Sequence, residues 1–262
     1  DEDYCTPLLL AAKAGDDEMV RLLLDAGASA GRRLSVEKPR VEEPGSEDGH
    51  FTDVETMKTE SALDLAAIGG HVDTINAIIE HDPLSINSVT ESTGNTALLY
   101  AVKHDQLGAL TALAEAGADL EVRDEDGNTA LHIAIISPLC DTILPELLRF
   151  GAKVNPTNRD GLTPLCLAVE EGHGAATHLL VSSGADVNVS LLNVSTLDDA
   201  MMRTLLGYGA DVNTKRAKDG NTPLHLAAQD ALSENVEFLL EAGGDETAVD
   251  SAGKTPADVT GQ

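Results

Sequence analysis

Histidine, cysteine and acidic side chains are the residues of this sequence that could bind a metal or act as bases and nucleophiles. The 262 residues include eight histidines, three cysteines and 45 aspartates and glutamates. The histidines form no HExxH pattern, and Cys5, Cys140 and Cys166 are far apart with no CxxC. The acidic cluster at 124–126 lacks the calcium-loop pattern, and no GxSxG or phosphate-binding glycine loop occurs. The sequence therefore predicts no catalytic residue, no metal site and no cofactor.

The formal net charge of −28 is the strongest compositional signal. Phosphate binding relies on lysine and arginine, so neither a nucleic-acid partner nor an anionic membrane surface is expected. Two interpretations remain open: the charge keeps a large surface soluble, or it attracts a basic protein segment.

Cysteine usage and hydropathy give an expected location. Three widely spaced cysteines favour a reducing compartment, and no apolar run is long enough to span a membrane. We therefore expect a cytoplasmic or nuclear protein that is monomeric on its own. Because the first residue is Asp1 rather than Met, we also expect a fragment of a longer protein.

One pattern recurs along the chain and identifies the elements that position everything else. It reads DGNTPLHLAA at Asp219–Ala228, DGLTPLCLAV at Asp160–Val169 and DGNTALHIAI at Asp126–Ile135. The threonines at 96, 129 and 163 are 33 and 34 residues apart. A second marker, such as EAGAD at 115–119 or SSGAD at 182–186, follows most of these threonines. Two markers in phase over most of the chain indicate a repeat architecture.

A period near 33 residues with the motif T-P-L-H-x-A resembles the ankyrin repeat. The resemblance covers almost the whole chain. It implies an all-α ankyrin-repeat solenoid of seven to eight helix-turn-helix repeats with hairpin loops, forming a single domain over residues 1–262. The repeats are expected near 4–29, 59–87, 94–121, 127–155, 161–188, 189–213 and 220–247, with a capping part-repeat at 253–262.

Each residue type in the motif also has a physical reason for its position. Thr222 can cap the first helix through its hydroxyl, and Pro223 at the first helical position lacks only an amide that would be unpaired there. In the second helix, Val236, Leu239 and Leu240 have the i, i+3, i+4 spacing of a buried stripe. Cys166 takes the place of His132 and His225 in the motif, which predicts a packing role for this cysteine.

Two departures from the repeat are informative. Residues 30–58 are a charged, proline-containing insertion between repeats one and two, which predicts a flexible loop that is either a tolerated insertion or a partner contact. Repeat six is about eight residues short, so its first helix is reduced or the stack bends there. Val189, Leu191 and Leu192 either fill the space of the lost helix or are exposed beside it.

The resemblance implies a non-catalytic module that binds another protein or peptide through its concave face and its hairpin tips. Carried onto this chain, the implied contact residues are Lys103, His104, Arg123, Asp124, Glu125, Ile136, Asn158, Arg159, Glu170, Glu171, Lys215, Arg216, Gln229 and Asp230. The acidic residues among them favour a partner with a basic segment.

Two alternative functions and one candidate modification stay open alongside this interpretation. The chain could be an acidic chaperone or reader of a basic protein, such as a histone tail or a ribosomal protein. It could instead recruit substrates for an enzyme whose catalytic domain lies outside it. Finally, Asn188 and Asn213 resemble the hairpin asparagines that an asparaginyl hydroxylase modifies in ankyrin proteins, although they could simply stabilise the hairpins by hydrogen bonds.

Overall fold

The computed structural model describes residues 6–30, 60–90, 93–193 and 197–259, and within these ranges the regular structure is entirely helical. The chain divides into two compact units, Asp1–Glu125 and Asp126–Gln262, and each is described by itself. The predicted insertion at 30–58 lies outside the described residues apart from Ala30, which is buried. The expectation of a single domain stays a prediction.

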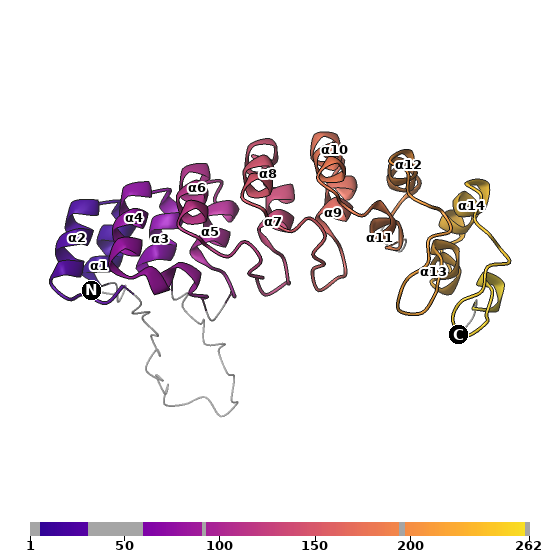
Figure 1. Cartoon of the computed structure of the whole chain (residues 1–262), viewed down its shortest axis with the longest axis horizontal. Coiled ribbons are helices and arrows are strands. Elements are labelled where there is room, and N and C mark those ends of the chain that lie inside the picture. The colour runs from indigo at the N-terminus through magenta and orange to yellow at the C-terminus, as the bar shows by residue number, and fades with distance from the viewer. Residues whose placement is uncertain (1–5, 31–59, 91–92, 194–196, 260–262) are drawn as a thin grey trace, which may run out of the picture. The chain divides into compact units, whose positions relative to one another are not determined.

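The first unit consists of three antiparallel helix pairs. In Figure 1 the first helices of the pairs form one row and the second helices another, and neighbouring helices within each row are in contact. The elements are α1 (Pro7–Ala14), α2 (Asp17–Asp25), α3 (Ala62–Gly69), α4 (Val72–His81), the 3₁₀ turn η1 (Pro83–Asn87), α5 (Ala97–Lys103) and α6 (Leu107–Glu115).

The second unit continues the same pattern with four helix pairs and a final 3₁₀ turn. Its first and second helices again form separate rows (Figure 1). The elements are α7 (Ala130–Ile136), α8 (Cys140–Arg149), α9 (Pro164–Glu170), α10 (Gly174–Ser182), α11 (Val187–Leu191), α12 (Asp199–Gly207), α13 (Pro223–Gln229), α14 (Ser233–Glu241) and η2 (Pro256–Asp258). The predicted helix-turn-helix repeats are therefore confirmed over the described ranges.

The first helices begin where the motif predicts. Thr222 is the N-cap of α13, where its hydroxyl accepts the backbone N–H of His225, and Pro223 occupies the first turn. Thr6 and Thr163 cap α1 and α9 in the same way, and Ser61 takes this role in α3. Each such cap stabilises its helix by about 1 kcal/mol, because it satisfies an amide that has no partner within the helix.

The core uses two motif positions in every complete repeat. Two residues after the capping threonine or serine there is a leucine, which is at most 3% exposed. Five residues after the same capping residue there is an alanine, which is at most 7% exposed. The small alanines allow first helices of adjacent repeats to approach closely, and each buried leucine contributes about 1.5–3 kcal/mol. The leucines are Leu8, Leu63, Leu98, Leu131, Leu165 and Leu224, and the alanines are Ala11, Ala66, Ala101, Ala134, Ala168 and Ala227.

The sixth repeat keeps a shortened first helix. It is reduced to the five residues of α11, whose N-cap is Asp186. Leu191 is fully buried and Leu192 is half-buried, so these two leucines fill space of the lost helix, whereas Val189 is 37% exposed. Leu197, which precedes α12, is also buried. The short helix still contacts α9, the first helix of the preceding repeat.

The buried stripe predicted for α14 is partly wrong. Leu239 is fully buried, but Leu240 is 42% exposed and Val236 is half-buried, while Phe238 is 5% exposed. The spacing identifies the apolar side of a helix, but it does not show whether a neighbouring element covers that side.

His132 carries a buried link between repeats, and its removal tests that link. Its Nε2–H donates to the carbonyl oxygen of Leu162 (3.0 Å), and its Nδ1 accepts the N–H of Thr129 (3.2 Å). Because the side chain is fully buried, we expect His132→Ala to lower the free energy of unfolding by about 2–4 kcal/mol. Urea denaturation measures this, and the exposed His81→Ala is the control. If His132→Ala lowers the free energy of unfolding no more than His81→Ala does, His132 does not link the repeats.

Candidate protein-binding surface

The exposed ends of the first helices are the first part of the candidate surface. The six residues that follow the capping threonine are almost all buried, and the seventh is exposed or half-exposed in each complete repeat. This seventh position differs in chemistry from repeat to repeat, and its residues are Lys13, Ile68, Lys103, Ile136, Glu170 and Gln229. Ile136 is 60% exposed, which is unusual for an isoleucine in a tightly packed repeat.

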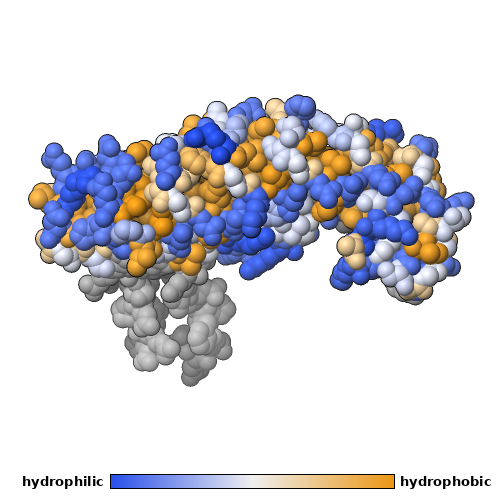
Figure 2. Space-filling view, viewed as in Figure 1, coloured by the Kyte–Doolittle hydropathy of each residue, from blue (hydrophilic) through white to orange (hydrophobic). Residues whose placement is uncertain are grey.

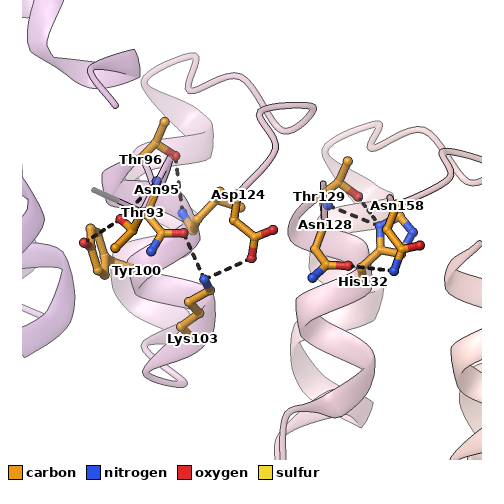
Figure 3. A network of polar contacts seen from close by, with 11 residues as sticks. Thr93, Asn95, Thr96, Tyr100, Lys103, Asp124, Asn128, Thr129, His132 and Asn158 are labelled. Atoms are coloured by element: carbon orange, nitrogen blue, oxygen red, sulfur yellow. Dashed lines mark hydrogen bonds and ion pairs between the residues drawn. The ribbon is translucent and has the colours of Figure 1, made fainter. Parts of the chain in front are cut away.

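A polar network in the first unit ties one predicted contact residue to another. The Lys103 ammonium lies 3.0 Å from a carboxylate oxygen of Asp124 and 2.9 Å from the amide oxygen of Asn95 (Figure 3). The Asp124 side chain is only 3% exposed, whereas that of Lys103 is 33% exposed. These residues join the end of α5 to the following hairpin. Arg123 and Glu125, on either side of Asp124, are exposed.

In the second unit the hairpin after α8 is shaped by an asparagine. The Asn158 side-chain amide donates to the Asn128 amide oxygen at 3.1 Å (Figure 3). The side-chain oxygen of Asn158 accepts the N–H groups of Asp160 and Leu162. The backbone N–H of Arg159 donates to the carbonyl of Asp126, which leaves the Arg159 side chain exposed at the tip. Asn158 therefore has a structural role, and Arg159 is the accessible residue of this pair.

The basic residues Lys215 and Arg216 are partly engaged by groups of their own and the following hairpin. Arg216 forms a bidentate ion pair with Asp219, and Lys215 donates to the carbonyl of Val249 (3.0 Å). The hydrogen bond from Arg216 holds the pKa of the Asp219 carboxyl below its usual value. The same pair raises the pKa of Arg216. Lys218 is exposed beside them.

Asparagines join successive hairpins by side-chain hydrogen bonds, which is one of the two interpretations that the sequence allowed for Asn188 and Asn213. The Asn188 amide oxygen accepts the N–H of Asp211 (2.8 Å), and that of Asn213 accepts the N–H of Asp245 (2.7 Å). Asn155 makes the equivalent bond to Asp186. Their recurrence after the Gly-Ala marker was the sequence signal for this link. Hydroxylation of Asn188 and Asn213 stays a prediction.

The histidine and cysteine positions form part of the fold. Cys166 is 1% exposed, and its Sγ accepts hydrogen bonds from Thr163 (3.3 Å) and Asn193 (3.2 Å), so the predicted packing role is confirmed. Burial raises the pKa of the Cys140 thiol, and Cys5 lies outside the described residues. Within residues 6–30, 60–90, 93–193 and 197–259 no cluster of three His, Cys, Asp or Glu side chains could hold a metal. None of the helices in these ranges is both long and apolar enough to cross a membrane.

Fold and surface together define a repeat protein built of helix-turn-helix units. The family described as "Ankyrin repeats (3 copies)" matches residues 8–124 and 110–190, and the one described as "Ankyrin repeats (many copies)" matches residues 205–259. The chain belongs to the ankyrin repeat family.

Individual relatives agree with this assignment. The chain is 40% identical over 107 residues to Ankyrin repeat and SOCS box protein 11 of Danio rerio, covering 37% of this chain and 36% of the relative. It is 34% identical over 167 residues to NF-kappa-B inhibitor zeta of Mus musculus, covering 60% of this chain and 23% of the relative. The chain thus spans well under half the length of both relatives.

A solved structure matches along the whole chain. The ankyrin repeat domain of Bcl-3, described as a unique member of the IkappaB protein family, is similar with a TM-score of 0.52 and 25% identity, covering 99% of this chain and 96% of that domain. The predicted all-α ankyrin fold is therefore confirmed.

The ion pair of Lys103 with Asp124 gives a stability prediction. Lys103→Met leaves a buried carboxylate without its cation, so we expect the free energy of unfolding to fall by about 1–3 kcal/mol. Lys13→Met is the matched control, because Lys13 is exposed at the equivalent position of the first repeat. Chemical denaturation of both variants measures the difference, and equal stabilities would show that the pair contributes nothing.

The Arg216–Asp219 pair gives a pH prediction. The folded-state pKa of Asp219 is depressed, so the stabilisation from this pair is present at neutral pH and is lost as the pH falls through that pKa. Arg216→Ala should raise the pKa of Asp219 towards the ordinary value, measured by carbon-13 NMR titration of the carboxyl. The pKa of Asp258, which is lowered by its bonds to Thr255, should stay where it is and serves as the internal control.

Proposed function

We propose that this chain is a non-catalytic protein-binding module that recognises its partner through the ends of its first helices and its hairpin tips. The observation that carries the proposal is a contrast between the buried positions of the repeat, which keep the same residue type, and an exposed position, which does not. The buried leucine and alanine are the same in every complete repeat, whereas the exposed seventh position carries lysine, isoleucine, glutamate or glutamine. A repeated framework that presents a non-repeating row of side chains suits the recognition of one particular partner surface.

The charge of this surface favours a partner with a basic segment. Glu170 and Glu171 are both exposed at the end of α9, and within the described residues neither forms an ion pair. Gln229 and Asp230 occupy the equivalent positions at the end of α13 and are also exposed. Hydrophilic residues cover much of the visible surface (Figure 2). Lysine or arginine side chains of a partner would gain favourable electrostatic interactions here and would associate faster.

The relatives support the general class of function. One is named an inhibitor of NF-kappa-B, so its name describes action on another protein. We infer that this chain likewise acts through a protein partner, in the cytoplasm or nucleus, as the recognition part of a longer protein. An acidic chaperone of basic proteins would be a special case of the same surface, distinguished by binding many basic proteins rather than one.

Charge reversal at the end of α9 tests the proposal. Glu170→Lys combined with Glu171→Lys should weaken capture of the partner from a cell lysate by about tenfold or more at low salt, because two attractive contacts become repulsive. The control is Glu18→Lys combined with Glu115→Lys, which changes the net charge equally on second helices.

The outcomes separate the possibilities clearly. Loss of a defined partner only in the α9 variant supports the proposed surface. Equal loss in both variants would mean that net charge alone attracts the partner, and retention in both would show that recognition lies elsewhere.

A further inference from the structure

The polar network of the third repeat shows how an asparagine beside a helix cap obtains its hydrogen-bond donor. Asn95 comes directly before the cap Thr96, and its side-chain oxygen Oδ1 accepts a hydrogen bond from the Lys103 ammonium at 2.9 Å (Figure 3). The same ammonium lies 3.0 Å from a carboxylate oxygen of Asp124. One cation from the end of α5 therefore satisfies an amide oxygen and a carboxylate together.

The seventh repeat has the same backbone arrangement around its own asparagine, Asn221. In repeat three the N–H of Thr90 donates to the backbone carbonyl oxygen of Asn95 at 2.8 Å. In repeat seven the N–H of Arg216 donates to the backbone carbonyl oxygen of Asn221, also at 2.8 Å. A capping threonine with an extended backbone follows each asparagine. The two asparagines therefore occupy equivalent positions.

The hairpin after each of these repeats passes equally close to the asparagine. The glycine before it, Gly94 or Gly220, has a positive φ and no side chain that would obstruct the hairpin. A Cβ atom at Gly94 would lie 3.3 Å from the backbone carbonyl carbon of Asp124. A Cβ atom at Gly220 would lie 3.4 Å from that of Asp250. Asp250 therefore takes the position of Asp124.

The donor is what differs between the two repeats. Asn221 is 8% exposed, and its buried Oδ1 has no hydrogen-bond partner among the residues that the structure describes. The position of Lys103 is held by Gln229, which is shorter, is exposed and makes no side-chain hydrogen bond within the described ranges. Asp250 is half-buried, and only its Oδ1 accepts hydrogen bonds there, from N–H groups of its own turn. A buried acceptor without a donor is destabilising, so this arrangement calls for a donor.

The fourth repeat shows a second way to supply the donor, and the seventh repeat cannot use it. In repeat four the side-chain amide of Asn158, in the following hairpin, donates to the Oδ1 of Asn128 at 3.1 Å. Asp250 holds that hairpin position in repeat seven. A carboxylate accepts hydrogen bonds and cannot donate them, so the hairpin adds a second acceptor instead of a donor.

Nearby cations of the chain are engaged elsewhere. Arg216 is held by Asp219 in a bidentate ion pair, and Lys215 donates to the backbone carbonyl of Val249. Asp230, exposed at the end of α13, adds a further negative charge. The end of α13 therefore offers oxygens to a cation that comes from outside the chain.

We propose that the end of α13 binds a lysine side chain of the partner protein. This lysine site consists of Asn221, Gln229, Asp230 and Asp250. The partner's ammonium would take the position that Lys103 takes in repeat three and would donate to the Oδ1 of Asn221 and to the Asp250 carboxylate. The inference rests on the proposed function, since Gln229 and Asp230 belong to its surface, and it names the residue that the partner places there.

An exchange between the two repeats tests their equivalence. Gln229→Lys should raise the urea midpoint of unfolding, because the new ammonium supplies the missing donor to Asn221 from within the chain. Gln229→Met has no donor and is the control. A midpoint that does not rise, or that rises equally for Gln229→Met, would overturn the equivalence on which the lysine site is based.

A small probe measures binding at the lysine site directly. The probe is N-acetyl-lysine N-methylamide, and the matched probe is its Nε-acetylated form, which has no ammonium. In a nitrogen-15 NMR titration of the 262-residue chain, the lysine probe should shift the side-chain amide signal of Asn221, and the acetylated probe should bind at least about tenfold more weakly. The side-chain amide of Asn95 is the internal control, because Lys103 already supplies its donor. Lys103→Gln should make the Asn95 signal respond as well.

Capture of the partner connects the lysine site to the proposed function. Gln229→Lys should weaken capture from a cell lysate by about tenfold or more, because its side chain occupies the place of the partner's lysine and repels it. Glu237→Gln is the control, since it changes the net charge equally at an exposed position of the second helix α14.

Failure of this inference can be told apart from failure of the proposed function. If the lysine probe leaves Asn221 unshifted, or if the acetylated probe binds as tightly, the end of α13 is not a lysine site. If Glu170→Lys with Glu171→Lys loses the partner and Gln229→Lys retains it, the proposed surface stands and the lysine site is not part of it. If both variants retain the partner, both proposals are wrong.

Discussion

A single helix pair of this chain cannot bury its own apolar surface, and every other feature depends on that constraint. In each complete repeat the first helix contributes one buried leucine and one buried alanine, and this helix contacts a neighbouring repeat. The free energy of unfolding is therefore close to a sum of the contributions of single repeats and of the interfaces between adjacent repeats. Polar links then fix the spacing between repeats: His132 reaches the carbonyl of Leu162, and Asn155 reaches the amide of Asp186. Each of these links runs from one side chain to a backbone group of the next repeat, so it does not depend on which side chains that repeat presents at the surface.

The sequence could predict the features that repeat and could not predict those that occur once. The capping threonines, the buried leucines and the role of Cys166 followed from position within the motif, because the same environment recurs at each copy. The pair of Lys103 with Asp124 was not predicted, since it joins residues 21 positions apart across a hairpin. The exposure of Leu240 was also missed, because local spacing carries no information about the absence of a covering helix.

The same reasoning separates the structural residues of the candidate surface from the accessible ones. Asp124 and Asn158 were expected to contact a partner, but the first is buried under Lys103 and the second holds its own hairpin together. Their neighbours Glu125 and Arg159 are exposed. In a hairpin of this kind, one residue must point inward to satisfy backbone and side-chain groups, and the next is then free to face solvent. Alternate residues of these tips are therefore the ones that are accessible to a partner.

The same constraint decides which apolar residues of the second helices are buried. Interior second helices such as α4 have neighbours on both sides, so a large apolar residue such as Ile75 is buried there without affecting solubility. At α14 the equivalent Val236 is half-exposed, and Leu240 of the same predicted stripe is exposed.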